Sequence, residues 1–130
     1  MSPVTIQLFV AGVLKNPLNH RAAHWSETYK SGEAWKNRTI AAWLELGRPT
    51  WEGPAAFTFT AYVAKLWDDD EGINAACKPI RDMAVKYICG TDDGPESGHS
   101  FAYEQKVQPQ YRGVLITVEP KPTGGVSAHE

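Results

Sequence analysis

The chain has 130 residues, a length typical of one compact domain, and a formal net charge of -2. Hydrophobic residues make up 42% and charged residues 22%, which is ordinary for a globular protein and excludes an intrinsically disordered chain. The net negative charge argues against a protein that coats DNA indiscriminately, although it is compatible with a local basic patch that binds nucleic acid.

No membrane span or secretory signal is predicted. The apolar run Val4–Leu14 lacks a basic flank and is interrupted by Thr5 and Gln7. Cys77 and Cys89 are too few for a disulfide framework, so we expect two free thiols in a reducing compartment. The expected protein is soluble and cytoplasmic, with no membrane partner.

The first half of the chain predicts two strands around one helix. Alternation of apolar residues indicates a strand over Thr5–Val10, followed by a loop-like stretch over Lys15–Tyr29 that contains Asn-Pro. A helix is predicted from Ser31 to about Leu46, ended by Gly47. A period of two then predicts a second strand from Ala56 to about Leu66.

The second half predicts one helix and two closing strands. Apolar residues at helical spacing run from Ile73 to Tyr87, and Gly90 is a plausible C-cap. Ser100–Val107 and Gly113–Glu119 look like strands that Gln108–Arg112 joins in a hairpin.

The element order predicts a single small α+β domain, with a mixed four-stranded sheet and two main helices on one face. Residues 1–120 would form this domain and residues 121–130 a flexible C-terminal tail. Trp35, Trp43 and both cysteines are expected in the core.

Charge is distributed unevenly along the chain. Residues 1–48 contain six basic and three acidic residues, whereas residues 68–96 contain eight acidic and three basic residues. This asymmetry indicates a cationic surface beside a cation-binding pocket.

Asp68–Glu71 comes directly off the end of the second strand. Asp69 and Glu71 would share one face of extended backbone, and Asp92 or Asp93 could complete a carboxylate set. Several carboxylates without clustered Cys or His favour Mg²⁺ or Mn²⁺, which could activate water and stabilise charge on a phosphodiester. The alternative interpretation is that the acidic run merely caps the following helix.

The run from Asp69 to Asp82, followed by Thr91–Asp93, resembles the RusA-type family of Holliday junction resolvases, in particular its phage branch. That family has a D-x-D-N-L segment leading into a helix, with a Lys and an Asp four residues apart and a D-D pair after the helix. The N-terminal segment from Asn16 to Trp25 is similar to the family's Asn/Arg/Trp loop, and Val114–Val118 is similar to its closing strand. The resemblance covers almost the whole chain, from Val4 to Pro120.

The resemblance implies a metal-dependent endonuclease in which Asp69, Glu71 and Asp93 are catalytic carboxylates. Asp69, Glu71 and either Asp92 or Asp93 would bind Mg²⁺ (or Mn²⁺), and Lys78 would be the essential helix lysine. This sequence departs from the family pattern at two positions, with Glu71 in place of the second Asp and glycine in place of the following Asn. From its spacing alone, Lys78 is a surface lysine paired with the residue at i+4.

The family also implies a homodimer, in which two active sites nick opposing strands of a four-way junction held mainly by phosphate contacts. A junction-binding protein with weak or no nuclease activity is an alternative on the same fold. A third interpretation is an interaction module without a nucleic-acid role. The candidate DNA-binding residues, which could equally form a solvated loop and helix face, are Lys15, Asn19, Arg21, His24, Lys30, Lys36 and Arg38.

Overall fold

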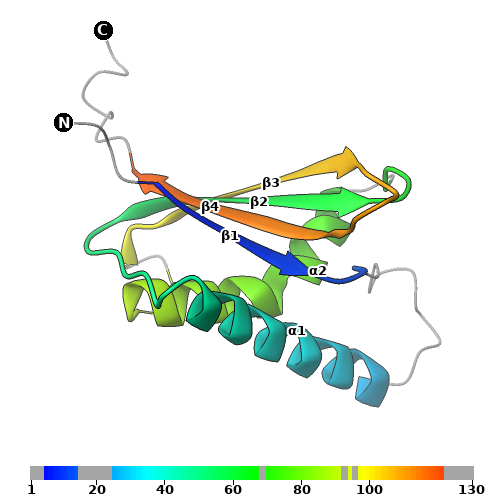
Figure 1. The fold of residues 1–130 in the computed structure, drawn as a ribbon, viewed down its shortest axis with the longest axis horizontal. Coiled ribbons are helices and arrows are strands. Elements are labelled where there is room, and N and C mark those ends of the chain that lie inside the picture. Colours follow the sequence, from blue (N-terminus) through cyan, green and yellow to red (C-terminus); the bar gives the residue numbers. More distant parts are fainter. Residues whose placement is uncertain (1–4, 15–24, 68–69, 92–93, 95–96, 122–130) are drawn as a thin grey trace, which may run out of the picture.

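A computed structural model describes residues 5–14, 25–67, 70–91, 94 and 97–121 of the chain. It is an α+β fold in which two helices cover one face of a mixed four-stranded sheet (Figure 1). The predicted fold class, sheet and placement of the helices are confirmed at this level. In the described parts of the chain, no helix is long and apolar enough to cross a membrane.

The elements follow the predicted order. Their bounds are β1 Ile6–Ala11, α1 Trp25–Glu45, β2 Ala55–Val63, α2 Asp70–Ala84, the π-helical turn η2 Val85–Cys89, β3 Ser100–Val107 and β4 Gly113–Pro120. The chain leaves η2 at Gly90, which has a left-handed backbone (φ 71°) and donates its N–H to the carbonyl of Lys86, so the predicted C-cap is confirmed.

The strand order in the sheet is β1-β4-β2-β3. β4 pairs antiparallel with both β1 and β2, whereas β2 and β3 are parallel and are connected through α2 and η2. The predicted hairpin between β3 and β4 is therefore wrong, because both strands pair with β2, which lies between them. The connection over residues 108–112 carries the chain past the end of β2, where Gln108 donates its N–H to the carbonyl of Val63.

The core lies between the sheet and the helices. Alternate residues of the strands point into it, including Phe57 and Phe59 of β2, and α2 contributes Ile73 and Ile80, which are at most 1% exposed. Trp35 of α1 is 3% exposed, as predicted for a core residue. The core positions predicted for the other tryptophan and the two cysteines are also confirmed. Cys77 is fully buried, whereas Trp43 and Cys89 are partly buried and pack against the core.

The first helix begins earlier than the sequence predicts. α1 starts at Trp25 rather than after Ser31, so the loop predicted over Lys15–Tyr29 is wrong for its last five residues, which the Asn-Pro pair and the neighbouring polar residues had suggested were non-helical. Its end agrees with the prediction. After it, Gly47 and Arg48 adopt left-handed backbone angles, and the indole Nε1 of Trp43 donates to the carbonyl of Pro49 at 2.8 Å.

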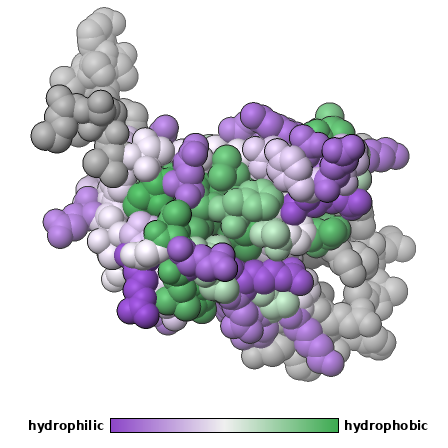
Figure 2. All heavy atoms as spheres, in the orientation of Figure 1, coloured by the Kyte–Doolittle hydropathy of each residue, from purple (hydrophilic) through white to green (hydrophobic). Residues whose placement is uncertain are grey.

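In the face shown in Figure 2, hydrophobic atoms gather over the strands in the middle of the view, and hydrophilic atoms cover α1 below them.

Candidate functional site

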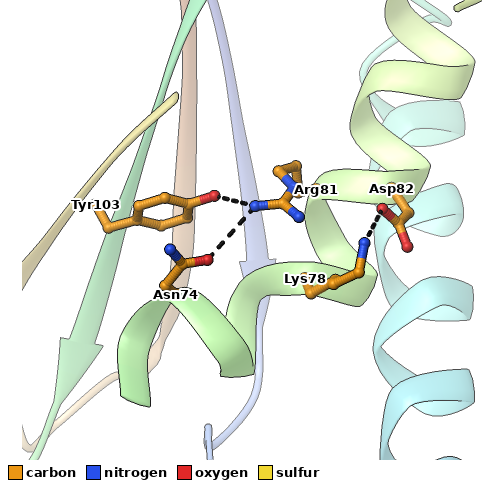
Figure 3. Close-up of polar contacts among 5 residues, drawn as sticks. All are labelled: Asn74, Lys78, Arg81, Asp82 and Tyr103. Atoms are coloured by element: carbon orange, nitrogen blue, oxygen red, sulfur yellow. Dashed lines mark hydrogen bonds and ion pairs between the residues drawn. The ribbon is translucent and has the colours of Figure 1, made fainter. Parts of the chain in front are cut away.

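The site is built on α2, which faces the core on one side and presents polar residues on the other. The buried side follows the helical spacing of Ile73, Cys77 and Ile80. Pro79 lies inside the helix, where its ring removes one backbone hydrogen bond and favours a bend. The polar side contains Asn74, Lys78, Arg81 and Asp82, which are shown with Tyr103 of β3 in Figure 3.

Arg81 joins α2 to β3. Its Nη1 donates to the hydroxyl of Tyr103 at 2.6 Å and lies 3.4 Å from Oδ1 of Asn74 (Figure 3). The guanidinium carbon also lies 5.5 Å from the ring centroid of Phe101, within cation–π range. These contacts fix the cationic head over the middle of the edge strand β3.

Lys78 lies one turn before Asp82 on the exposed side of α2. Its Nζ is 3.2 Å from Oδ1 of Asp82, and the two side chains are 57% and 32% exposed. The i,i+4 pair expected from the sequence is therefore present. Such an exposed pair contributes little to stability.

The first acidic segment is only partly described. Asp68 and Asp69 lie outside the described residues, while α2 already begins at Asp70, so position 71 is helical. The expectation that Asp69 and Glu71 share one face of extended backbone is thus wrong for the second of these positions. Because position 71 precedes Lys78 by seven residues, the two positions share one side of the helix about two turns apart.

Trp67 anchors the chain just before this segment. Its N–H donates to Oε1 of Gln105 at 2.7 Å, and its carbonyl accepts from Nε2 of the same side chain at 3.2 Å. This two-point contact attaches the first acidic segment to β3 near the carboxyl end of the strand.

Asp92 and Asp93 lie outside the described residues. Thr91, the residue before them, contacts the amino-terminal end of β3. Thr91 Oγ1 is 3.1 Å from Nε2 of His99, the residue immediately before β3. Six residues separate His99 from Gln105, which is about 20 Å of extended chain at roughly 3.3 Å per residue. Trp67 and Thr91, the described residues before the two acidic segments, therefore contact well-separated points of β3.

His99 links the second segment to the start of β2. Its Nδ1 accepts the N–H of Ala55 at 3.1 Å, so the neutral ring carries its proton on Nε2 and donates it to Thr91. Burial, and then the charge of Lys121, lower the pKa of His99 below its ordinary value of 6.5. This ring acts as a neutral structural link at neutral pH.

Three of the predicted DNA-binding residues lie on α1, and Lys15, Asn19, Arg21 and His24 lie outside the described residues. Lys30 is exposed, Lys36 lies 3.4 Å from Glu33, and the Arg38 guanidinium lies 5.1 Å from the ring centroid of Trp35. Lys30 and Arg38, eight residues apart, fall within about a quarter turn of each other.

Neither cysteine thiol is reactive at neutral pH. Burial raises the pKa of Cys77 to about 12 and that of Cys89 to about 11, so neither is a nucleophile at neutral pH. Among the described residues, no three His, Cys, Asp or Glu side chains are close enough to hold a metal ion.

Sequence reasoning missed Arg81, Tyr103 and His99. The seven-residue spacing from Asn74 to Arg81 could have placed these two on one side of the helix. No local signal identifies Tyr103 or Ala55 as partners, because each contact joins residues far apart in the chain.

No known family model matches the chain, and no curated protein sequence is significantly similar to it.

Proposed function

We propose that the protein is a Mg²⁺-dependent, structure-selective endonuclease that cleaves four-way junctions or other branched DNA in recombination and repair. The observation that carries the proposal is the order of acidic segment, Lys78-x-x-x-Asp82 helix and second acid pair, which resembles the RusA-type resolvases. The topology supports it, because that helix connects two parallel strands and begins within the acidic segment.

The proposed metal ligands are Asp69 and Glu71, and Asp92 or Asp93 is a further carboxylate whose part is tested separately, because the described neighbour Thr91 contacts the other end of β3. An all-carboxylate set suits a hard cation such as Mg²⁺ or Mn²⁺. The bound metal would lower the pKa of a water molecule and offset charge on the phosphate. Lys78 would stabilise the charge that develops on the phosphate oxygens, a role for which its exposed position on α2 is suitable.

The described residues next to the two acidic segments contact opposite ends of β3, because Trp67 contacts Gln105 and Thr91 contacts His99. We therefore expect the first pair to be indispensable for cleavage and the contribution of Asp92 and Asp93 to be separable from it.

DNA would be held mainly through phosphate contacts, in which the exposed cations of α1 take part. Of the three described candidates, Lys30 and Arg38 are exposed and share one side of that helix, whereas Lys36 is partly buried and pairs with Glu33. A homodimer would present two such surfaces and two sites, which is what symmetric cleavage of a four-way junction needs.

A junction-binding protein with weak or no nuclease activity is the second candidate. Glu71 and Gly72 favour it, because these positions depart from the D-x-D-N pattern of the family. Glutamate is one methylene longer than aspartate and alters the geometry of a metal site.

The test incubates the protein with a four-way DNA junction and a matched linear duplex, with Mg²⁺ or with EDTA. Asp69→Asn, Asp93→Asn and Lys78→Gln are compared with Glu52→Gln, a change at an exposed acid outside the proposed site. Nicking of the junction alone that requires Mg²⁺ and is lost in Asp69→Asn supports the nuclease.

Other outcomes discriminate between the candidates. Tight junction binding without cleavage by the unaltered protein refutes the nuclease and supports the binding protein. Neither binding nor cleavage refutes both.

A further inference from the structure

Three aromatic side chains form a cluster on the sheet face opposite the helices. Phe9 of β1, Tyr62 of β2 and Tyr111 before β4 have ring centroids 5.7–6.1 Å apart, with tilted or edge-to-face orientations. Phe9 is 38% exposed and Tyr111 is 56% exposed. We call these three residues the aromatic cluster.

Gly113 forms the floor of the aromatic cluster. The register aligns it between Ala11 and Tyr62, and a Cβ at this position would meet the backbone carbonyl of Val10 first and would lie 2.6 Å from Cζ of Phe9. The missing side chain therefore lets the Phe9 ring lie directly on β4. The packing holds the rings in defined positions although their outer surfaces remain in solvent.

Cations flank the aromatic cluster. Lys106 is the register partner of Tyr62 and is exposed. The segments 64–67 and 108–112 at this end of the sheet contribute Lys65 and Arg112, and the acidic run 68–71 follows the first of them in the chain. On the same face Glu104 shares the register row of Phe9, but three strand spacings, about 14 Å, separate the two.

Exposed rings beside cations fit a ligand that combines flat π surfaces with negative charge. Single-stranded nucleic acid has both, since its bases stack on aromatic side chains and its phosphates pair with Lys and Arg. A second copy of the chain fits less well. A stable interface buries about 800 Å² per partner around an apolar centre, whereas this face continues with Gln7, Thr58 and Thr117.

We propose that the aromatic cluster is a stacking site for unpaired bases of single-stranded DNA. The inference rests on the proposed function only in taking DNA as the ligand. The aromatic cluster lies on the sheet face opposite α2, so it would hold unpaired bases on a different face from Lys78.

The test measures binding of a labelled oligothymidine of about ten nucleotides by fluorescence anisotropy. Tyr111→Ala is compared with Tyr111→Phe, which keeps the ring, and with Leu46→Ala, which removes an equally exposed apolar side chain after α1. We expect Tyr111→Ala to weaken binding about tenfold, as is usual when a stacking aromatic is removed, while the other two variants bind as the unaltered protein does.

Lys106→Gln provides a second variant that leaves the rings in place. We expect it to flatten the dependence of log affinity on log salt concentration by about 0.7, the value for one contact to a single-strand phosphate. An unchanged salt slope, together with unchanged binding by Tyr111→Ala, overturns the proposal.

Measuring binding to a fully paired four-way junction as well distinguishes failure of the stacking site from failure of the proposed function. Junction binding without oligothymidine binding refutes the stacking site and leaves the proposed function standing. Oligothymidine binding that needs Tyr111, without junction binding or cleavage, supports the stacking site and refutes the proposed function. If Tyr111→Ala changes only the oligomeric state, the aromatic cluster is a contact between copies and the stacking site is refuted.

Discussion

Replacing His99 with alanine is expected to destabilise the fold by about 2–4 kcal/mol. Ala55 is fully buried and its N–H donates to Nδ1 of His99, so the variant leaves a buried donor without an acceptor at a cost of about 1–3 kcal/mol. The lost edge-to-face contact with Phe57, at 5.5 Å, adds about 0.5–1.5 kcal/mol.

His99→Asn is the matched control, because the asparagine Oδ1 takes the place of Nδ1 and can accept the same N–H. We expect it to retain most of the stability that the alanine variant loses. The assay is urea unfolding followed by tryptophan fluorescence at pH 7.5. Equal destabilisation by the two variants would refute the assigned hydrogen bond.

The same ring makes stability depend on pH. Burial and Lys121 hold the pKa of His99 below 6.5 in the folded protein, whereas the unfolded chain takes up the proton near pH 6.5. Between these two pKa values the unfolded state binds more protons, so stability falls as the pH falls. The contribution is complete above pH 6.5 and is lost below it. The effect should be absent in His99→Asn, and an identical pH profile for the two proteins would contradict this account.

Three further changes test the packing and the site. Gly113→Ala should cost about 1–3 kcal/mol in urea unfolding, because the added methyl meets the backbone carbonyl of Val10 and the Phe9 ring; unchanged stability would contradict this close packing of β4 against β1. Tyr103→Phe should cost about 1–2 kcal/mol, because it removes the hydroxyl that accepts from Arg81; no loss would mean that the bond is not maintained in solution. The Cys77 thiol, with a pKa of about 12, should resist a disulfide reagent at pH 8 until urea unfolds the protein, and equally fast reaction of the folded protein would contradict its burial.

The strands and helices were predictable wherever burial leaves a periodic pattern. β2 alternates apolar and polar residues because one side of it is core, and β3 was predicted with its observed bounds. The start of α1 was missed because the Asn-Pro pair and the polar residues before Ser31 were interpreted as a loop. The turn η2 has no sequence signature, since a π-helical turn arises from packing around an otherwise ordinary helix.

Strand pairing was the harder problem. The short connection between β3 and β4 favours a hairpin, but the sequence does not show that β2 offers a free edge to each of them. In the candidate site, too, local contacts were predictable and contacts between distant segments were not. The Lys78–Asp82 pair is local and was predicted from its spacing, whereas the partners of Arg81 and His99 come from other elements and depend on the tertiary fold.

The position of β4 in the sheet affects how the chain can fold during synthesis. Among the described strands β4 leaves the ribosome last, yet it lies between β1 and β2, and Ile6 of β1 pairs with Val118 of β4. Until β4 emerges, β1 has no partner strand, and only the parallel pair β2–β3 can form. Such long-range pairing slows folding and leaves strand edges exposed in the meantime. Nascent chains that stop before β4 should therefore bind chaperones, and release of the last strand should complete the sheet in a single step.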